Sequence, residues 1–144
     1  MSTPTDREIY EKIRLEHEHL RELLGNIHQA LSTRAETVDE ISGMMTSLQK
    51  HLQEHFHEEE DGGFFKEIVS QAPRMSDRAD AIENEHVDLS TAVDELVNVA
   101  SKESELCKTM EAGFHDFSKA LMHHETKENE LLLDAYEEDI GSAD

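Results

Sequence analysis

Apolar residues recur at alternating steps of three and four along most of the chain, with polar residues between them. This spacing places an apolar stripe on one face of an α-helix and is typical of helices that pack nearly parallel. Four segments carry such a stripe, so the pattern predicts four long helices. In chain order the stripes are Ile9, Ile13, Leu20, Leu24, Ile27 and Leu31; Val38, Ile41, Met45, Leu48 and Leu52; Ile82, Leu89, Val93, Leu96 and Ala100; and Cys107, Met110, Phe114, Phe117, Leu121 and Leu131.

Helix start and stop signals divide the chain in agreement with the stripes. The signals are Thr3-Pro4 for the first helix, a Thr37–Glu40 capping box for the second, Gly62-Gly63 before a short segment over 64–69, Ser76-Asp77 for the third helix to about Ala100, and a polar link over 101–104. Because the links are short, we expect an all-α, up-down-up-down antiparallel four-helix bundle over residues 1–136. Residues 137–144 are expected to form an acidic flexible tail.

The two halves of the chain align with each other at an offset of 69 residues without a gap. Stripe residues of the first and second predicted helices fall on stripe residues of the third and fourth. Three pairs of polar stripe residues match in the same register: His17 with His86, His55 with His124, and Glu59 with Glu128. Glu16 also aligns with Glu85, and Phe64 aligns with Leu133. The chain is therefore interpreted as two related helical hairpins that face each other.

Six residues of this repeat are polar although they lie on the apolar stripes. They are His17, His55, Glu59, His86, His124 and Glu128. Buried carboxylates without partners are costly, and two divalent cations would remove that cost. The His-x-x-x-Glu spacing puts both donors on one helix face, and antiparallel hairpins bring the donors to similar depth. We predict two metal ions, each bound by two histidines and sharing two glutamates, with room for a bridging oxide or hydroxide and one small ligand.

The donor types and the remaining histidines and cysteine limit which metals and which further ligands are expected. Nitrogen and oxygen donors without thiolate suit iron or manganese and do not exclude zinc. Five histidines lie off the stripes and are expected at the surface: His19, His28, His57, His115 and His123. His51 stays open as a further ligand, because it precedes His55 by one helical turn but has Ala120 as its repeat counterpart. Cys107 is on a stripe and is expected to be a buried structural thiol.

Composition excludes several classes of function. The chain has 144 residues and a formal charge of −21, which argues against nucleic-acid and membrane-surface partners. Its single cysteine excludes an intrachain disulfide and a thiolate metal cage. No apolar run approaches the roughly 20 residues that span a bilayer, and the first residues lack a signal-like apolar core. We expect a cytoplasmic protein that is a monomer or small homo-oligomer.

The ordered motifs resemble those of the hemerythrin-like (HHE cation-binding) domain family over about residues 5–135. They are Glu16-His17 with Leu20-Arg21, His55-x-x-x-Glu59 with Phe64-Phe65, Glu85-His86 with Leu89, and His124-Glu125-x-x-Glu128. The resemblance implies a four-helix bundle with a non-heme di-iron centre that binds or reacts with O2, NO or peroxide. Carried over by position, its ligands are the same six residues that the spacing predicts. It favours iron over manganese and zinc.

The chain departs from the pattern of the reversible oxygen carriers at two positions. Ser90 stands four residues after His86, where the carriers have a histidine, and Asn129 stands five after His124, where they have an acidic residue. His123 lies five before Glu128, so a shifted register stays open, although the repeat and the stripe favour His124. The four-histidine, two-glutamate set is closer to the hemerythrin-like domains of iron-centre repair and iron-sensing proteins.

Three functions follow from these observations. The leading hypothesis is a di-iron protein that binds or senses O2, NO or related reactive oxygen and nitrogen species, as in a stress response. The second is a di-iron enzyme that detoxifies peroxide or NO, or that repairs iron centres. The third is a metal-free acidic bundle that serves as an interaction module, which stoichiometric metal would eliminate.

Overall fold

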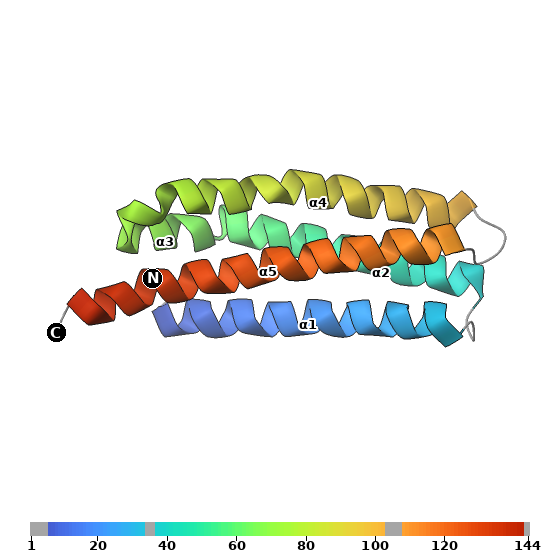
Figure 1. Cartoon of the computed structure of the whole chain (residues 1–144), viewed down its shortest axis with the longest axis horizontal. Helices are drawn as coiled ribbons and strands as arrows, with labels where there is room; N and C mark the ends of the chain where they lie inside the picture. The colour runs from blue at the N-terminus through green and yellow to red at the C-terminus, as the bar shows by residue number, and fades with distance from the viewer. Residues whose placement is uncertain (1–5, 34–36, 103–107, 143–144) are drawn as a thin grey trace.

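A computed structural model describes residues 6–33, 37–102 and 108–142. These ranges contain helices and no strand. The elements are α1 (Asp6–Thr33), α2 (Val38–Asp61), the short α3 (Phe64–Gln71), a 3-10 turn η1 (Pro73–Met75), α4 (Ser76–Lys102) and α5 (Lys108–Ser142). Figure 1 shows α1, α2, α4 and α5 lying alongside one another along the longest axis of the molecule. The all-helical class and the four long helices are confirmed.

Local sequence signals account for the ends of α2. The Thr37 hydroxyl accepts a hydrogen bond from the backbone N–H of Glu40 at 3.1 Å, as the capping motif predicts. At the other end Gly63 has a φ of 96°, in the left-handed region that glycine adopts without strain. This residue turns the chain from α2 into α3, so the expected short segment after the glycine pair is confirmed.

The last helix is longer than expected. α5 stays helical to Ser142, whereas we expected a tail to begin at residue 137. The sequence explains the difference, because no proline or glycine follows Gly113 until Gly141. The Thr3-Pro4 signal, residues 103–104 of the expected link and the stripe residue Cys107 lie outside the described residues.

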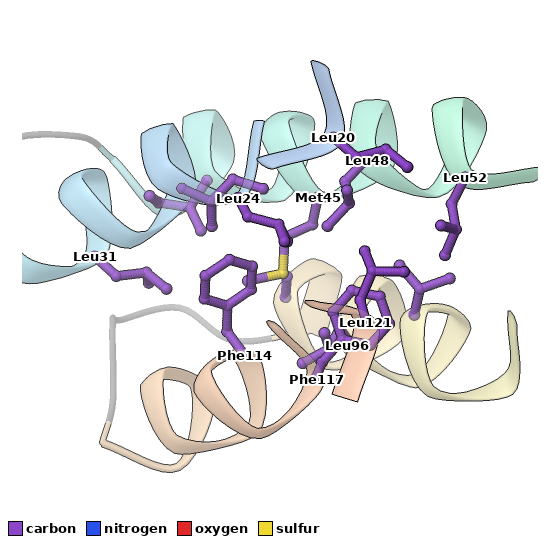
Figure 2. Packing of buried hydrophobic residues seen from close by; sticks show 14 of the residues in the cluster. Leu20, Leu24, Leu31, Met45, Leu48, Leu52, Leu96, Phe114, Phe117 and Leu121 are labelled. Atoms are coloured by element: carbon purple, nitrogen blue, oxygen red, sulfur yellow. The ribbon is translucent and has the colours of Figure 1, made fainter. Parts of the chain in front are cut away.

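The buried apolar side chains form two clusters at different depths of the bundle. The long helices contact one another in a ring, in which α1 and α4 each pack against both α2 and α5. The larger cluster draws on all four, and Figure 2 shows its side chains, among them Met45, Phe114 and Phe117, pointing toward one another. The smaller cluster includes Ile13, Ile82, Leu131 and apolar residues of α3. The described residues of the predicted stripes therefore form the core, except Val38, which is partly buried; the side chain of Ile9 lies outside the described part of the structure.

The boundary between these clusters falls at the six polar stripe positions. The stripes of α1, α4 and α5 continue from one cluster into the other, whereas the smaller cluster receives α3 where α2 has ended. The apolar neighbours of these polar positions belong to opposite clusters: Leu20, Leu52, Leu89 and Leu121 to the larger, and Ile13, Phe64, Ile82 and Leu131 to the smaller. The six polar residues thus lie in a layer between two apolar clusters. None of the described helices has the length and apolar character required to cross a membrane.

The internal repeat ends just beyond this layer. Phe64 is 4% exposed, but Leu133, which the alignment at an offset of 69 pairs with it, is 42% exposed. The expected equivalence of these two residues is therefore wrong. The reason is the turn at Gly63, which redirects the chain after α2, whereas α5 continues straight through the corresponding position.

Candidate metal centre

The structure brings the six predicted residues together as two groups of possible metal ligands. Each of the six is at most 5% exposed. In one group, ligand atoms of His17, His55, Glu59 and Glu128 lie within 4.8 Å of one another, and in the other so do those of Glu59, His86, His124 and Glu128. The two glutamates are common to both groups, so each group has two histidines and shares two carboxylates. This is the arrangement that the repeat predicts.

Glu128 on α5 extends one carboxylate oxygen toward each group. Its Oε1 atom is 3.1 Å from His17 Nε2 and 4.0 Å from His55 Nε2. Its Oε2 atom is 3.5 Å from His86 Nε2 and 3.4 Å from His124 Nε2. A carboxylate in this position can bridge two cations.

Glu59 on α2 occupies the matching position from the other hairpin. Its Oε1 atom lies 3.3 Å from His55 Nε2 and 3.3 Å from His86 Nε2. All four imidazoles therefore present the same nitrogen, Nε2, to the two carboxylates. The histidines of each group come from one hairpin, and the glutamates connect the hairpins.

The outer nitrogens of two of these imidazoles are fixed by carboxylates that are repeat counterparts. His55 Nδ1 donates to Glu16 at 2.7 Å, and His124 Nδ1 donates to Glu85 at 2.8 Å. Lys127 Nζ pairs with the other oxygen of Glu85 at 2.5 Å. Donation from Nδ1 leaves the Nε2 lone pair free to bind a cation, which is how imidazole ligands of metals are commonly oriented.

The other two imidazoles also have partners in repeat register. His17 Nδ1 donates to Asn129 Oδ1 at 3.0 Å, and His86 Nδ1 lies 3.6 Å from Glu60 Oε1. Asn129 and Glu60 are 69 residues apart, but the first contact is a hydrogen bond and the second is longer than one. Sequence reasoning matched Glu16 to Glu85 without assigning a role, and it considered Asn129 only as a departure from the oxygen carriers. The alignment at an offset of 69 pairs Glu16 with Glu85 and Glu60 with Asn129, so it could have indicated all four of these partners.

Several donor atoms in this layer are buried without a hydrogen-bond partner. They are His55 Nε2, both oxygens of Glu59, His86 Nε2, His124 Nε2 and Glu128 Oε2. Buried polar atoms are normally hydrogen-bonded, and leaving one unpaired costs about 1–3 kcal/mol. Unpaired atoms that converge from α2, α4 and α5 and carry lone pairs fit bound cations. The residues present therefore fit a pair of metal ions.

The two shared carboxyls have opposite pKa shifts. Burial and the negative charge of Glu128 raise the pKa of Glu59 well above its usual range. Burial acts in the same direction on Glu128, but the close approach of Glu59, His124 and His17 outweighs it and holds the pKa of Glu128 well below its usual range. The metal-free centre thus keeps Glu59 protonated beside an ionised Glu128, because two adjacent buried charges of one sign repel each other. Cations would stabilise both carboxylates in the ionised form.

The remaining histidines lie outside both groups. The five expected at the surface are exposed: His19, His28, His57, His115 and His123. The exposure of His123 decides the register that the sequence left open, because His124 is the residue that faces the centre. His51 is partly exposed and meets His19 edge-on at a centroid distance of 5.0 Å, and neither group of ligand atoms includes it.

Aromatic and acidic residues to which the sequence reasoning assigned no role surround the centre. Phe56 stacks on His86 with ring centroids 3.8 Å apart and an interplanar angle of 9°, and Phe65 lies 5.6 Å from the same imidazole. Glu125 is fully buried, although sequence reasoning quoted it only as part of a motif. Its repeat counterpart is Phe56, and an apolar counterpart is a signal that this glutamate faces inward.

A surface cavity reaches the first group from outside. Its volume is about 250 Å³, and its walls include Glu16, His55, Leu20 and the surface residues His19 and His51. The cavity borders the outer side of His55, where Glu16 binds Nδ1. A small molecule or ion in this cavity is therefore separated from the buried carboxylates by the imidazole of His55.

Comparisons with known proteins agree with this geometry. The family model described as the hemerythrin HHE cation-binding domain matches residues 8–136, which contain all six residues of the two groups. Searches of curated proteins and of solved structures gave no match to this chain.

Proposed function

The chain belongs to the hemerythrin HHE cation-binding domain family, and on this premise we propose that it is a di-iron protein that binds or senses O2, NO or related reactive oxygen and nitrogen species. In this proposal one iron ion is bound by His17 and His55 and the other by His86 and His124. Glu59 and Glu128 would each contribute a carboxylate to the binding of both ions. The observation that carries the proposal is the sharing of these two buried carboxylates by both groups of ligand atoms.

The proposal includes the up-down-up-down order of the bundle. Support comes from the colours of Figure 1, in which α1 and α2 run in opposite directions, and so do α4 and α5. Further support is the depth of the polar layer, which lies between the same two apolar clusters on α1, α4 and α5 and at the junction of α2 with α3. Two related hairpins would then supply three ligands each.

The donor set favours iron over softer metals, because it consists of imidazoles and carboxylates without a thiolate. Iron bound at this site supplies redox chemistry and a coordination position for a small ligand. The protein residues hold the donors in place and exclude bulk water. Phe56 and Phe65 cover the imidazole of His86, and the cavity beside His55 provides the entry path.

A second candidate function is turnover of peroxide or NO, or delivery of iron to damaged iron centres. The observation that favours it is the same cavity, whose walls include His55 and the exposed Glu54 and Glu58. A path lined with carboxylates suits the passage of a cation, and an open path suits repeated exchange of substrate and product. This candidate uses the same two ions as the first, but the bound molecule is converted or the iron is released instead of being held.

Addition of O2 or NO to anaerobic iron(II)-loaded protein tests the proposal. We expect new visible absorption bands that are lost when the gas is removed, and we expect none in the double variant His55→Ala/His124→Ala. His57→Ala is the matched control, because His57 is exposed on α2 two residues from His55. Sustained consumption of peroxide or NO would favour the second candidate, and iron-loaded protein that responds to neither gas would contradict the first.

A further inference from the structure

Glu125 is a seventh buried polar side chain in this part of the bundle, and the two groups of ligand atoms do not include it. Its side chain is fully buried, and neither carboxylate oxygen has a hydrogen-bond partner. Arg21 forms an ion pair with Glu125, but Nε lies 3.6 Å from Oε2, beyond hydrogen-bonding distance. A buried carboxylate with so little compensation is expensive to keep in a core, so it calls for an additional partner.

The neighbours of Glu125 place it on the side of the first group. Glu125 precedes Glu128 by about one turn of α5, and Arg21 follows His17 by about one turn of α1. Glu128 contacts His17 at 3.1 Å, and Glu125 contacts Arg21 at 3.6 Å. The two contacts are thus neighbouring contacts between α1 and α5. Glu125 lies about one helical turn from Glu128, on the side of the larger apolar cluster.

The corresponding position in the other hairpin is apolar. Phe56, 69 residues earlier, stacks on His86 and meets His124 edge-on at a centroid distance of 5.7 Å. The counterpart of Arg21 is Ser90, so the second half lacks the neighbouring positive charge as well. One half of the pseudosymmetric centre therefore has an aromatic cover where the other has a carboxylate.

We propose that Glu125 is an additional protein ligand of the metal ion that His17 and His55 bind, so that the two metal positions are unequal. The inference rests on the proposed two-metal centre. The first position then has five protein ligands, and the second, under Phe56, has four. Arg21 forms the ion pair with Glu125 in the structure, so a bound ion would compete with Arg21 for this carboxylate.

Metal titration of the full chain tests this assignment. Metal-free protein is titrated with Co²⁺, whose visible absorption depends on coordination number, and the number and affinity of the bound ions are also measured by calorimetry. Glu125→Gln keeps the shape of the side chain and removes its charge. Glu130→Gln is the matched control, because Glu130 is exposed on the same helix.

We expect the wild type and Glu130→Gln to bind two ions with the same affinities and spectra. Glu125→Gln is expected to bind one of the two ions at least tenfold more weakly, with a changed Co²⁺ spectrum for that ion. The loss should persist when His124→Ala disables the second position, and it should disappear when His17→Ala disables the first. Arg21→Gln, a change at a half-exposed residue, should strengthen binding of the first ion, because it removes a competing cation.

Different failures would be distinguishable. Equal affinities and spectra for Glu125→Gln and the wild type, with two ions bound in each, would overturn the role of Glu125 and leave the two-metal centre intact. A Glu125→Gln variant that does not fold leaves the Arg21→Gln titration, where unchanged affinity for the first ion would overturn the inference. Wild-type protein that binds no ion would overturn the proposed function itself.

Discussion

At the scale of single residues, the centre depends on how each imidazole is oriented. All four present Nε2 to the shared carboxylates. The outer nitrogens of His55 and His124 donate to Glu16 and Glu85, so that in the neutral imidazole Nε2 carries the lone pair that a metal ion binds. The hydrogen bonds thus preorganise the donors before a metal ion arrives.

Glu85→Gln tests this preorganisation. An amide is a weaker acceptor than a carboxylate and also loses the pairing with Lys127, so His124 should be held less well. We expect metal affinity to fall about 10- to 100-fold while the helical circular dichroism stays unchanged. Asp88→Asn, an exposed change on the same helix, is the control. Equal metal affinity in the two variants would show that the hydrogen bond to His124 does not orient a ligand.

Buried carboxyls give the metal-free protein a defined pH dependence. Burial, as the largest effect, raises the pKa of Glu59 well above its ordinary value of 4.5 and raises the pKa of Glu125 to about 7. The folded state therefore binds more protons than the unfolded state between these values, and the free energy of unfolding falls as the pH rises through this range. His124 acts in the same direction, because interactions with Glu128 and Glu85 outweigh burial and raise its pKa.

We expect metal-free protein to require less denaturant to unfold at about pH 8 than at about pH 5. Glu125→Gln should flatten this dependence, since it removes one of the titrating groups. Urea titrations at several pH values, with chelator present, provide the measurement. Metal-free protein whose stability rises over this range would contradict the assigned protonation states.

At the scale of elements, the break after α2 sets the two hairpins apart. α2 ends at Asp61, and the left-handed backbone at Gly63 starts α3, which carries Phe65 toward His86. α5 has no such break and passes the layer as one helix. Sequence signals predicted the break, because a glycine pair stops a helix. They did not predict how far α5 runs, because its last turns show neither a strong stop signal nor an apolar stripe.

Gly63→Ala should destabilise the protein by about 1 kcal/mol or more, because alanine adopts a φ near +96° only with strain. Gly25→Ala is an informative control, since Gly25 is exposed within α1 and has no atom within 4 Å of an added Cβ. That change should leave stability unchanged or raise it by up to about 1 kcal/mol. Thermal unfolding of both variants measures the difference. A Gly63→Ala variant as stable as the wild type would show that the left-handed turn is not required.

At the scale of the whole molecule, a polar layer interrupts the hydrophobic core. Two apolar clusters lie on either side of it, and the layer draws on α1, α2, α4 and α5. Two cations in this layer would connect the four helices and neutralise carboxylates in a chain of charge −21. Metal binding should therefore stabilise the fold as a whole, because a ligand bound only to the folded state raises its stability.

The sequence predicted this layer better than its surroundings. The six inward residues were found because polar residues on an apolar stripe are conspicuous, and because the same residues recur 69 positions later. Glu125 escaped this reasoning, because the search was for polar residues that recur 69 positions apart and its repeat counterpart Phe56 is apolar. The register with His124 rather than His123 also needed the structure, since both spacings to Glu128 were plausible along the sequence.

The most direct test of the account is the number of metal ions that one chain binds. Metal-free protein is reconstituted with iron(II) under anaerobic conditions, desalted and analysed for iron by elemental analysis, beside the variants His55→Ala/His124→Ala and His57→Ala. We expect two iron ions per chain in the wild type and in His57→Ala, with a raised unfolding temperature, and a clear loss of iron in the double variant. Wild-type protein that retains no metal, or that retains as much as the double variant, would contradict the two-metal centre.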